Sequence, residues 1–576
     1  MYRNLSVLVA CTFLFSNCGP EIEADLVLVN GKVITVDDSF SVHTAIAVKN
    51  ERILAVGTDD EIDAYRGGST EVYDLRGRTA MPGLIDSHTH PASSSIVEYD
   101  HEIPDMETIE DVLSYIRSRA AVLQEGEWIW VSQIFLTRLQ EQRYPTKEEL
   151  DEAAPKNPTV FQTGPDASVN SLALKLSGIN ERWKVTDGGP GYAEKNPKTG
   201  RLTGILRSCT RYLKSQSSTN IPTQDEHVAW FKRLLADYNR VGITGVGERD
   251  ASGDEIQLYS RMRNEGDLTV RAYLSRHVDT IPELEEIRKE IQRLRESPLY
   301  AGDDMLRVPA VKTYLDGGML TGSAYMREPW GTSHLYGITD PDYRGLRFIP
   351  EEKLVAIMAA CFENDVQFMA HCVGDGAVHA FIEACGALSD RYDIASKRPV
   401  ICHSNFMSEE AVKRAAGLGI PVDIQPAWLY LDGRTLHHHF GYERLSWFQP
   451  LKAIFKAGGI VGGGSDHMQK IGSLRSINFY DPWMAMWVAM TRKARWLDEP
   501  LHPEHALSRE EVIRFYTINN AYLLFAEDKV GSLETGKLAD FIILSKDILT
   551  CPPDQIRNMK VERTYLGGKL VHQSDS

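Results

Sequence analysis

Short apolar runs alternate with amphipathic segments through the middle of the chain, and this alternation limits its fold more than any other feature. Six helical segments separate many of the runs, at Asp225–Arg240, Pro282–Arg295, Pro350–Asn364, Ala377–Ser389, Glu409–Leu418 and Leu451–Ala457. The runs predict eight strands, at Met81–Ile85, Ile243–Glu248, Thr269–Leu274, Val308–Tyr314, Val366–Ala370, Val400–Cys402, Val422–Gln425 and Ile460–Gly463. Alternating strands and helices are typical of α/β proteins with a parallel sheet. Eight units favour a closed (β/α)8 (TIM) barrel over an open doubly wound sheet.

The two ends of the chain share a different texture. Residues 24–77 alternate short apolar runs with turns, and Asn30-Gly31 predicts a β-hairpin. Residues 539–571 repeat this texture. Each end is too short to form a stable hydrophobic core by itself, so we expect both ends to pair into one small β-sandwich.

These patterns predict three parts after a leader. The β-sandwich would comprise residues 22–79 and 528–574, and the barrel would occupy residues 80–527. Residues from about 92 to 223 break the strand–helix rhythm and would form an insertion after the first barrel strand. A long excursion on the catalytic face of a barrel is suited to be a substrate lid.

The first residues predict export. Arg3 precedes the apolar run Leu5–Phe15, which is too short to span a bilayer and suits a signal-peptide core. The leader, residues 1–18, ends at Cys18, which predicts a lipid anchor and a periplasmic or outer-membrane-associated bacterial lipoprotein. A simple cleaved signal, or no export, is the alternative.

Composition narrows the partners. The 576 residues include 43% hydrophobic and 25% charged residues, which is globular composition. The net charge of −17 comes without a basic block, which argues against a nucleic-acid partner. The six cysteines beyond the leader are scattered, and most lie in apolar segments, so they indicate buried thiols.

Side chains that can bind a metal recur at the ends of the predicted strands. His88 and His90 lie two apart, so in a strand they project to the same side and can face one cation. Four more candidates follow or end other strands: Lys312, His371, His403 and Asp466. Each of these residues, taken alone, could have an ordinary structural role, such as a histidine in the core or an aspartate in a turn. Their recurrence at equivalent strand ends predicts one site, because barrel enzymes build their sites from the ends of different strands.

These residues and their order resemble the amidohydrolase superfamily, and more closely its amidohydrolase 3 (YtcJ-like) branch, which includes N-substituted formamide deformylases. The resemblance covers nearly all of the chain after the leader. It rests on Ala24–Gly31, Met81–His90, Asn170–Leu174, Lys312 with Asp316-Gly317, His371 with Gly374-Asp375, Gly464–Asp466, Thr491-Arg492 and Gly531–Asp540.

The resemblance implies a role for each candidate. His88 and His90 would hold a first metal, and His371 and His403 a second. Lys312, carboxylated by CO2 to a carbamate, would bridge the two. Asp466 would ligate the first metal, take a proton from the activated water and deliver it to the leaving nitrogen. One or two zinc ions suit these N and O ligands, and manganese or iron could occupy similar sites.

The function implied is that of a metal-dependent hydrolase acting on a non-peptide carbon–nitrogen bond of a small amide, formamide or cyclic amide. Two alternatives stay open: ester hydrolysis or ring deamination on the same barrel, and a non-catalytic exported lipoprotein that acts as a binding module. Besides the small-molecule substrate, a membrane reached through Cys18 and a second copy in a homo-oligomer are the candidate partners.

Two positions depart from the branch. Pro165-Asp166 stands where relatives often have a histidine, and Ser404-Asn405 stands where they tend to have Ala-Gln. Neither departure touches a candidate ligand, and both could reshape the substrate pocket. The run His437–His439 cannot aim three side chains at one cation from regular structure, so we interpret it as a polar loop element.

Overall fold

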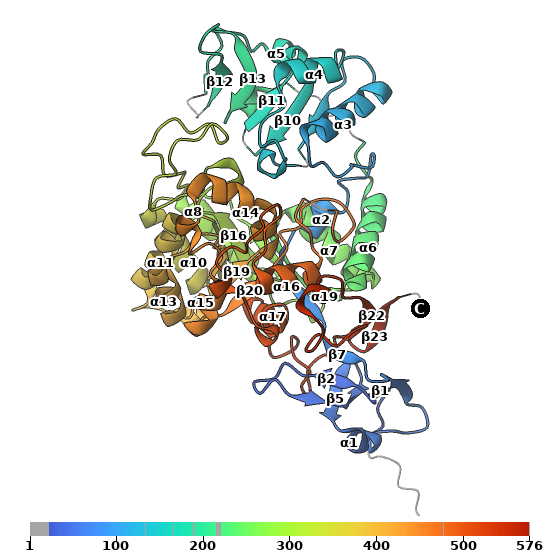
Figure 1. Cartoon of the computed structure of the whole chain (residues 1–576). Coiled ribbons are helices and arrows are strands. Elements are labelled where there is room, and N and C mark those ends of the chain that lie inside the picture. The colour runs from blue at the N-terminus through green and yellow to red at the C-terminus, as the bar shows by residue number, and fades with distance from the viewer. Residues whose placement is uncertain are drawn as a thin grey trace, which may run out of the picture.

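The computed structural model describes residues 22–132, 134–164, 166–187, 191–214, 220–475 and 477–574. A central barrel lies between a β-sandwich lobe at one end and a mixed α/β lobe at the other (Figure 1). Leu5–Phe15 and the predicted anchor Cys18 lie outside the described residues. Within the described residues, no helix combines the length and the apolar character needed to cross a bilayer.

The barrel is one sheet of eight strands, and all seven neighbouring pairs are parallel. The sheet runs from β8 to β20, and a parallel bridge between Thr89 and His467 joins its two edges. The predicted (β/α)8 architecture is therefore confirmed. In chain order the strands are β8 (Leu84–Thr89), β14 (Ile243–Ala251), β15 (Arg271–His277), β16 (Leu306–Tyr314), β17 (Gln367–Cys372), β18 (Val400–His403), β19 (Val422–Ile424) and β20 (Val461–Gly463).

Helices follow most of the barrel strands, and α6 (Gln224–Arg240) shows why they form. Thr223 and Glu226 make a capping box at its start, which satisfies two backbone N–H groups that would otherwise lack partners. Its buried stripe ends at Tyr238, whose hydroxyl lies 2.7 Å from His467 Nδ1 and 3.0 Å from Thr89 Oγ1. The helix thus supports the seam that closes the barrel.

The other predicted helices are also present. They are α8 (Leu284–Glu296), α10 (Glu351–Glu363), α11 (Asp375–Leu388), α13 (Glu409–Gly417) and α15 (Leu451–Lys456). The run of three histidines ends another helix, α14 (Pro426–Phe440), so the prediction of a polar loop there was wrong. His439 Nε2 lies 3.1 Å from the carbonyl oxygen of Trp330, and this contact gives the run a structural role.

The predicted first strand is in fact two strands. β7 (Thr79–Pro82) pairs with β21 (Phe541–Leu544) in the sandwich, and β8 begins the barrel at Leu84. Gly83 separates them, where a Cβ atom would lie 2.2 Å from Thr244 Oγ1. Glycine has no Cβ atom and therefore permits this close approach. The chain leaves the sandwich sheet and enters the barrel sheet at this residue.

Strands from both chain ends build the sandwich. One sheet has the order β5-β4-β1-β6, and the other has the order β23-β22-β21-β7-β2-β3. The two sheets share a core in which Leu28 and Ile46 of the first pack with Phe541 and Ile543 of the second. In chain order the strands not yet given are β1 (Leu26–Val29), β2 (Lys32–Ile34), β3 (Val42–His43), β4 (Ala45–Lys49), β5 (Arg52–Gly57), β6 (Glu71–Asp74), β22 (Val561–Leu566) and β23 (Lys569–Gln573).

The hairpin predicted at Asn30-Gly31 is absent from this part of the described chain. β1 and β2, which flank the turn, belong to different sheets. A Cβ atom on Gly31 would lie 2.2 Å from Leu75 Cδ1, so the glycine serves a tight crossing between layers. A two-residue turn signal is local and does not specify which strand will be the partner.

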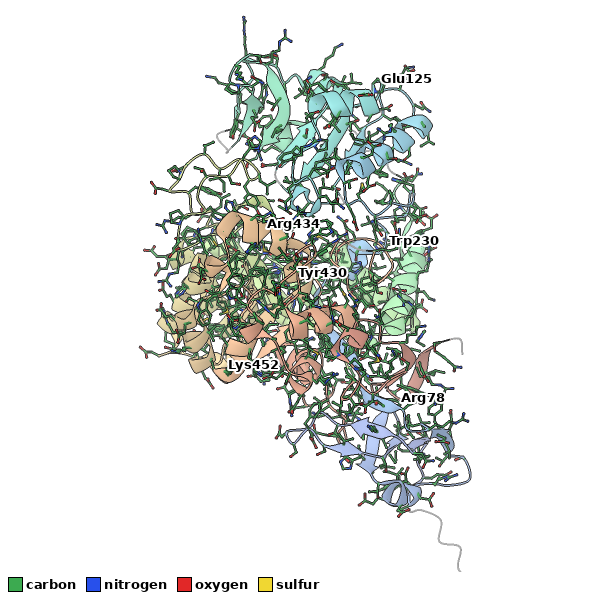
Figure 2. All side chains as sticks on the ribbon, viewed as in Figure 1. Arg78, Glu125, Trp230, Tyr430, Arg434 and Lys452 are labelled. Atoms are coloured by element: carbon green, nitrogen blue, oxygen red, sulfur yellow. The ribbon has the colours of Figure 1, made fainter. Side chains whose placement is uncertain are left out.

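The insertion lies between α2 (Pro91–Ser94) and α6. Its sheet has the order β12-β13-β11-β10-β9. It packs with α3 and α4 in one hydrophobic cluster that includes Ile116 and Phe161, and with α5 in another that includes Val160 and Leu174. Its elements are α3 (Ile109–Val122), β9 (Ile129–Val131), η1 (Leu136–Arg138), α4 (Lys147–Ala153), β10 (Thr159–Thr163), β11 (Asp166–Val169), α5 (Ser171–Ser177), β12 (Tyr192–Lys195), β13 (Leu202–Arg207) and η2 (Thr210–Tyr212). Arg434 of α14 lies on the side of the barrel that faces this lobe (Figure 2).

Candidate metal centre

A cavity of about 770 Å³ lies at the carboxyl ends of the barrel strands. It is lined by the strand ends, the insertion, the loop between β16 and α10, and three residues that follow β19 or β20: Trp428, Met468 and Asn478. All six residues that the sequence singled out reach this cavity: His88, His90, Lys312, His371, His403 and Asp466.

The four histidines form a continuous chain of rings. The ring centroids of His88 and His90 lie 5.5 Å apart, and those of His88 and His403 lie 4.5 Å apart. His371 completes the chain at 4.5 Å from His403. The β17 and β18 register places Cys372 beside His403, which brings the neighbouring His371 to the same rim.

Two of these imidazoles converge on one carboxylate oxygen. Asp466 Oδ1 lies 3.7 Å from His88 Nε2 and 3.3 Å from His90 Nε2. One ligand atom from each of the three residues falls within 4.8 Å of the others. Ligands about 2.0–2.2 Å from a tetrahedral zinc are separated by roughly 3.3 Å, so these spacings fit a cation between the three side chains.

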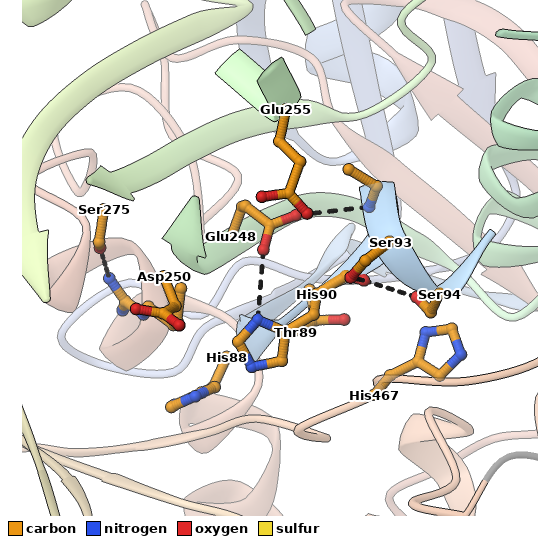
Figure 3. A network of polar contacts seen from close by, with 12 residues as sticks. His88, Thr89, His90, Ser93, Ser94, Glu248, Asp250, Glu255, Ser275 and His467 are labelled. Carbon is orange, nitrogen blue, oxygen red and sulfur yellow. Dashed lines mark hydrogen bonds and ion pairs between the residues drawn. The ribbon is translucent and has the colours of Figure 1, made fainter. Parts of the chain in front are cut away.

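Buried acceptors orient the rings. Nδ1 of His88 donates to Asp423 Oδ2 at 2.7 Å, and Nδ1 of His403 donates to Gln425 Oε1 at 2.8 Å. In both rings the proton therefore sits on Nδ1, which leaves the lone pair of Nε2 free to bind a metal. Glu248 Oε1 faces His90 Nδ1 at 3.4 Å in the same manner (Figure 3).

The electrostatic surroundings keep three of the histidines neutral. Burial lowers the pKa of His88 and of His403 well below the ordinary value, and lowers the pKa of His371 to about 3. The Lys312 ammonium is a further cause of the lowered pKa in each of these three histidines. Neutral imidazole is the form that ligates a metal.

His90 differs from the other three. Burial alone would lower its pKa, but hydrogen bonds to Asp466 and Glu248 outweigh burial and raise the pKa of His90 to about 10. The two carboxylates therefore attract a positive charge to this point of the cavity. A metal ion bound there would replace the ring proton as that charge.

The backbone around Asp466 is tightly constrained. Asp466 has a φ of +54°, and its N–H donates to the carbonyl oxygen of His88 at 2.7 Å. A Cβ atom on Gly464 would lie 2.6 Å from His88 Cβ, so the glycine run after β20 lets the two strand ends meet. A non-glycine residue at positive φ is costly and persists where neighbouring contacts hold it.

Lys312 is 1% exposed inside the barrel. Its Nζ lies 5.2 Å from the ring centroid of Tyr314, whose hydroxyl donates to Asp250 Oδ2 at 2.9 Å. The structure brings Lys312 into electrostatic reach of His88, His371 and His403, as their lowered pKa values record. Lys312 therefore lines the same cavity as the four histidines.

The walls of the cavity are largely apolar. The insertion contributes Phe135 and Tyr192, and the loop after β16 contributes a further apolar set: Met319, Leu320, Tyr336, Ile338, Leu346 and Phe348. The one arginine among the described lining residues, Arg207, is paired with Asp166 at 2.9 Å. Asp166 is one of the positions where the sequence departs from the branch.

The orienting residues were not singled out from the sequence. Glu248 and Gln425 end two predicted strands, and Asp423 lies within one of them, so a polar residue at a strand end was the available signal. The break in the strand–helix rhythm marks the insertion as a candidate lid, and it does line the cavity, whereas the loop after β16 carries no comparable signal. Ser404-Asn405 is the other position where the sequence departs from the branch. There, Ser404 Oγ and both polar atoms of the Asn405 side chain are buried without a protein partner.

A parallel eight-stranded barrel with histidines and a carboxylate converging at its carboxyl rim defines a class of barrel hydrolases. The chain belongs to the amidohydrolase family, whose model matches residues 71–572. The predicted class of enzyme, a hydrolase acting on carbon–nitrogen bonds other than peptide bonds, is confirmed at this level.

Individual relatives agree with the family. The chain is 27% identical to an N-substituted formamide deformylase of Arthrobacter pascens, over 95% of this chain and 98% of the relative. It is 23% identical to the putative amidohydrolase YtcJ of Bacillus subtilis, over 92% and 96% of the two chains. An uncharacterized metal-dependent hydrolase from Pyrococcus furiosus has the same fold, with a TM-score of 0.64 and 20% identity over 91% of this chain and all of that one.

Proposed function

We propose that this protein hydrolyses the carbon–nitrogen bond of a small uncharged amide or formamide, with water activated at a metal centre. The observation that carries the proposal is the convergence of His88 Nε2 and His90 Nε2 on Asp466 Oδ1 at the floor of the cavity. The formamide deformylase of Arthrobacter pascens, similar over almost its whole length, supports the choice of bond.

The residues present fit a divalent metal. His88, His90 and Asp466 would hold one ion, and His371 with His403 would hold a second. Reaction of the Lys312 amine with CO2 would give a carbamate. This group would replace the positive charge of the lysine by two anionic oxygens that could bind the two ions. When bound, such an ion polarises the scissile carbonyl and lowers the pKa of a water molecule. The nitrogen and oxygen donors suit zinc best.

The side chains of the chain perform the proton transfers. The Asp466 carboxylate would accept a proton from the attacking water and deliver it to the leaving nitrogen. Asp423 and Gln425 hold the rings of His88 and His403 with the lone pair of Nε2 available for a metal. Burial lowers the pKa of both rings well below the ordinary value, so neither imidazole competes with Asp466 for that proton. The insertion and the loop after β16 form walls of the cavity around these side chains.

The cavity favours a neutral substrate with an apolar substituent. Its arginine, Arg207, is already paired with Asp166. Among the described lining residues, no unpaired arginine is therefore available to bind a carboxylate of a substrate. Phe135, Ile338 and Phe348 offer apolar area instead. An apolar pocket with few fixed polar groups selects by shape and burial of the substituent.

A substrate screen tests the proposal. Zinc-loaded protein would be incubated with N-formyl, N-acyl and cyclic amides that carry apolar substituents, and the released amine would be measured. We expect turnover of at least one neutral amide by the wild type and almost none by Asp466→Asn. Turnover of esters or of ring amines without turnover of any amide would reassign the reaction.

A further inference from the structure

The insertion reaches the proposed catalytic base through a buried hydrogen-bonded chain. Arg138, in η1 of the insertion, lies 340 residues before Asn478, yet its Nη1 donates to Asn478 Oδ1 at 2.9 Å. Asn478 Nδ2 in turn donates to the carbonyl oxygen of Asp466 at 2.8 Å and lies 3.4 Å from Asp466 Oδ2. Three side chains therefore connect the lobe outside the barrel to the carboxylate inside it.

The direction of this chain is set by the groups that take part. A guanidinium has only donors, so Asn478 must turn its oxygen towards Arg138. Its amino group then faces Asp466 and takes one side of the carboxylate. Oδ2 is turned to Asn478, and Oδ1 stays with His88 and His90.

Arg138 is fixed from its other side by a buried ion pair. Its Nε donates to Asp432 Oδ1 at 2.9 Å, and its Nη2 donates to Asp432 Oδ2 at 2.7 Å, in a two-point contact with α14. Arg138, Asp432 and Asn478 are at most 2% exposed. A desolvated arginine in a two-point ion pair has one orientation, so its Nη1 is aimed with little freedom at Asn478 Oδ1 and at the carbonyl oxygen of Ile477.

We propose that Arg138 and Asn478 are positioning residues for Asp466, and that docking of the insertion through Arg138 sets the orientation of the base. This inference rests on the proposed function, because it assigns to Asp466 the proton transfer described there. The positive φ of Asp466 makes such support necessary: its N–H is held by His88 and its carbonyl oxygen by Asn478. The insertion is then part of the catalytic apparatus and more than a cover.

The primary test compares kcat and KM of zinc-loaded full-length variants on one amide substrate found in the screen. Asn478→Ala and Arg138→Met should each lower kcat by about 10- to 100-fold, the usual cost of removing a group that orients an active-site side chain. KM should stay within about twofold, and zinc content should stay that of the wild type, because neither residue is a candidate ligand. The double variant Asn478→Ala with Arg138→Met should be no slower than the slower single variant, since both act through one chain.

Two further variants separate orientation from folding and docking. Arg138→Met leaves Asp432 buried and unpaired, so Arg138→Met with Asp432→Leu removes both charges and should restore the melting temperature while kcat stays low. Thr435→Val removes contacts of α14 with Thr137 and Gln142 at the same docking surface, but does not touch Asn478. It should keep kcat within about twofold of the wild type.

The outcomes distinguish this inference from the proposed function. If Asp466→Asn abolishes turnover while Asn478→Ala keeps the wild-type kcat, the positioning role is wrong and the proposed function stands. A loss of kcat in Thr435→Val as large as that in Arg138→Met would also overturn the positioning role. Undiminished turnover by Asp466→Asn would overturn the proposed function itself.

Discussion

The barrel rim and the insertion meet at one cavity but bring different kinds of side chain to it. The rim supplies buried histidines and carboxylates whose second polar atoms are already hydrogen-bonded, as in the contact of His88 with Asp423. The insertion supplies Phe135 and Tyr192 on the cavity wall, and one buried arginine that reaches inwards. In the proposed function, the rim would supply the chemistry, while the insertion would shape the substrate space and orient Asp466.

This division follows from the rigidity of each region. Strands of a closed barrel are hydrogen-bonded on both edges, so side chains at their ends keep fixed separations. The insertion has a sheet and hydrophobic clusters of its own, and it meets the barrel at side chains such as Arg138 and Phe135. Variants in the two regions should therefore differ in which kinetic constant they change.

The largest effect is expected at the rim. Asp466→Asn keeps the size of the side chain and removes the proton acceptor, so kcat should fall by about 10²- to 10⁴-fold. The melting temperature should change little. A matched control is Asp340→Asn, at a lining aspartate that contacts none of the candidate ligands in the described hydrogen bonds and ion pairs. Equal losses in both variants would contradict the special role of Asp466.

The second effect concerns Lys312. Lys312→Ala removes the only candidate bridge between the two metal positions, so we expect zinc content and activity to fall together. Short carboxylates such as acetate or propionate should restore part of both, because they can supply anionic oxygens in the space that is left. Lys353→Ala, at a lysine of α10, is the control and should retain its zinc. Loss of activity with full zinc content in Lys312→Ala would rule out the bridging role.

The smallest effect is expected at the insertion wall. Phe135→Ala should raise KM for amides with a bulky apolar substituent, and kcat/KM should fall by about tenfold, which corresponds to roughly 1.4 kcal/mol. The kcat/KM for small formamides should fall much less, because such substrates do not reach the Phe135 side chain. Val122→Ala, at an exposed residue of α3, is the control. A uniform loss for small and bulky substrates would show that Phe135 does not act on the substituent.

The sequence predicts the two regions unequally. Periodicity and the order of apolar runs locate the eight strands and the six candidate residues, because each signal is local to its own strand. The contact between Arg138 and Asn478 joins residues 340 positions apart, and no local pattern marks it. The change of sheet at Gly83 and the crossing between sheets at Gly31 were not predicted for a related reason. Each depends on a close approach to a residue that is distant in sequence, and this approach exists only in the folded structure.

The orienting residues fall between these cases. Glu248, Asp423 and Gln425 lie at or near the ends of predicted strands, so their positions were available from the sequence. Their partners were not, because the ring nitrogen that each contacts depends on how neighbouring strands are staggered. A search for polar residues at every predicted strand end would have found Glu248 and Gln425, and a search inside the strands would have added Asp423.

The central claim is that six rim residues form a metal centre, and the metal content of the purified protein tests it most directly. Protein expressed in zinc-replete medium would be analysed by inductively coupled plasma mass spectrometry, beside the double variant His88→Ala with His90→Ala. We expect one or two transition-metal ions per wild-type chain and a lower number in the variant. A folded wild-type protein without stoichiometric transition metal would contradict it.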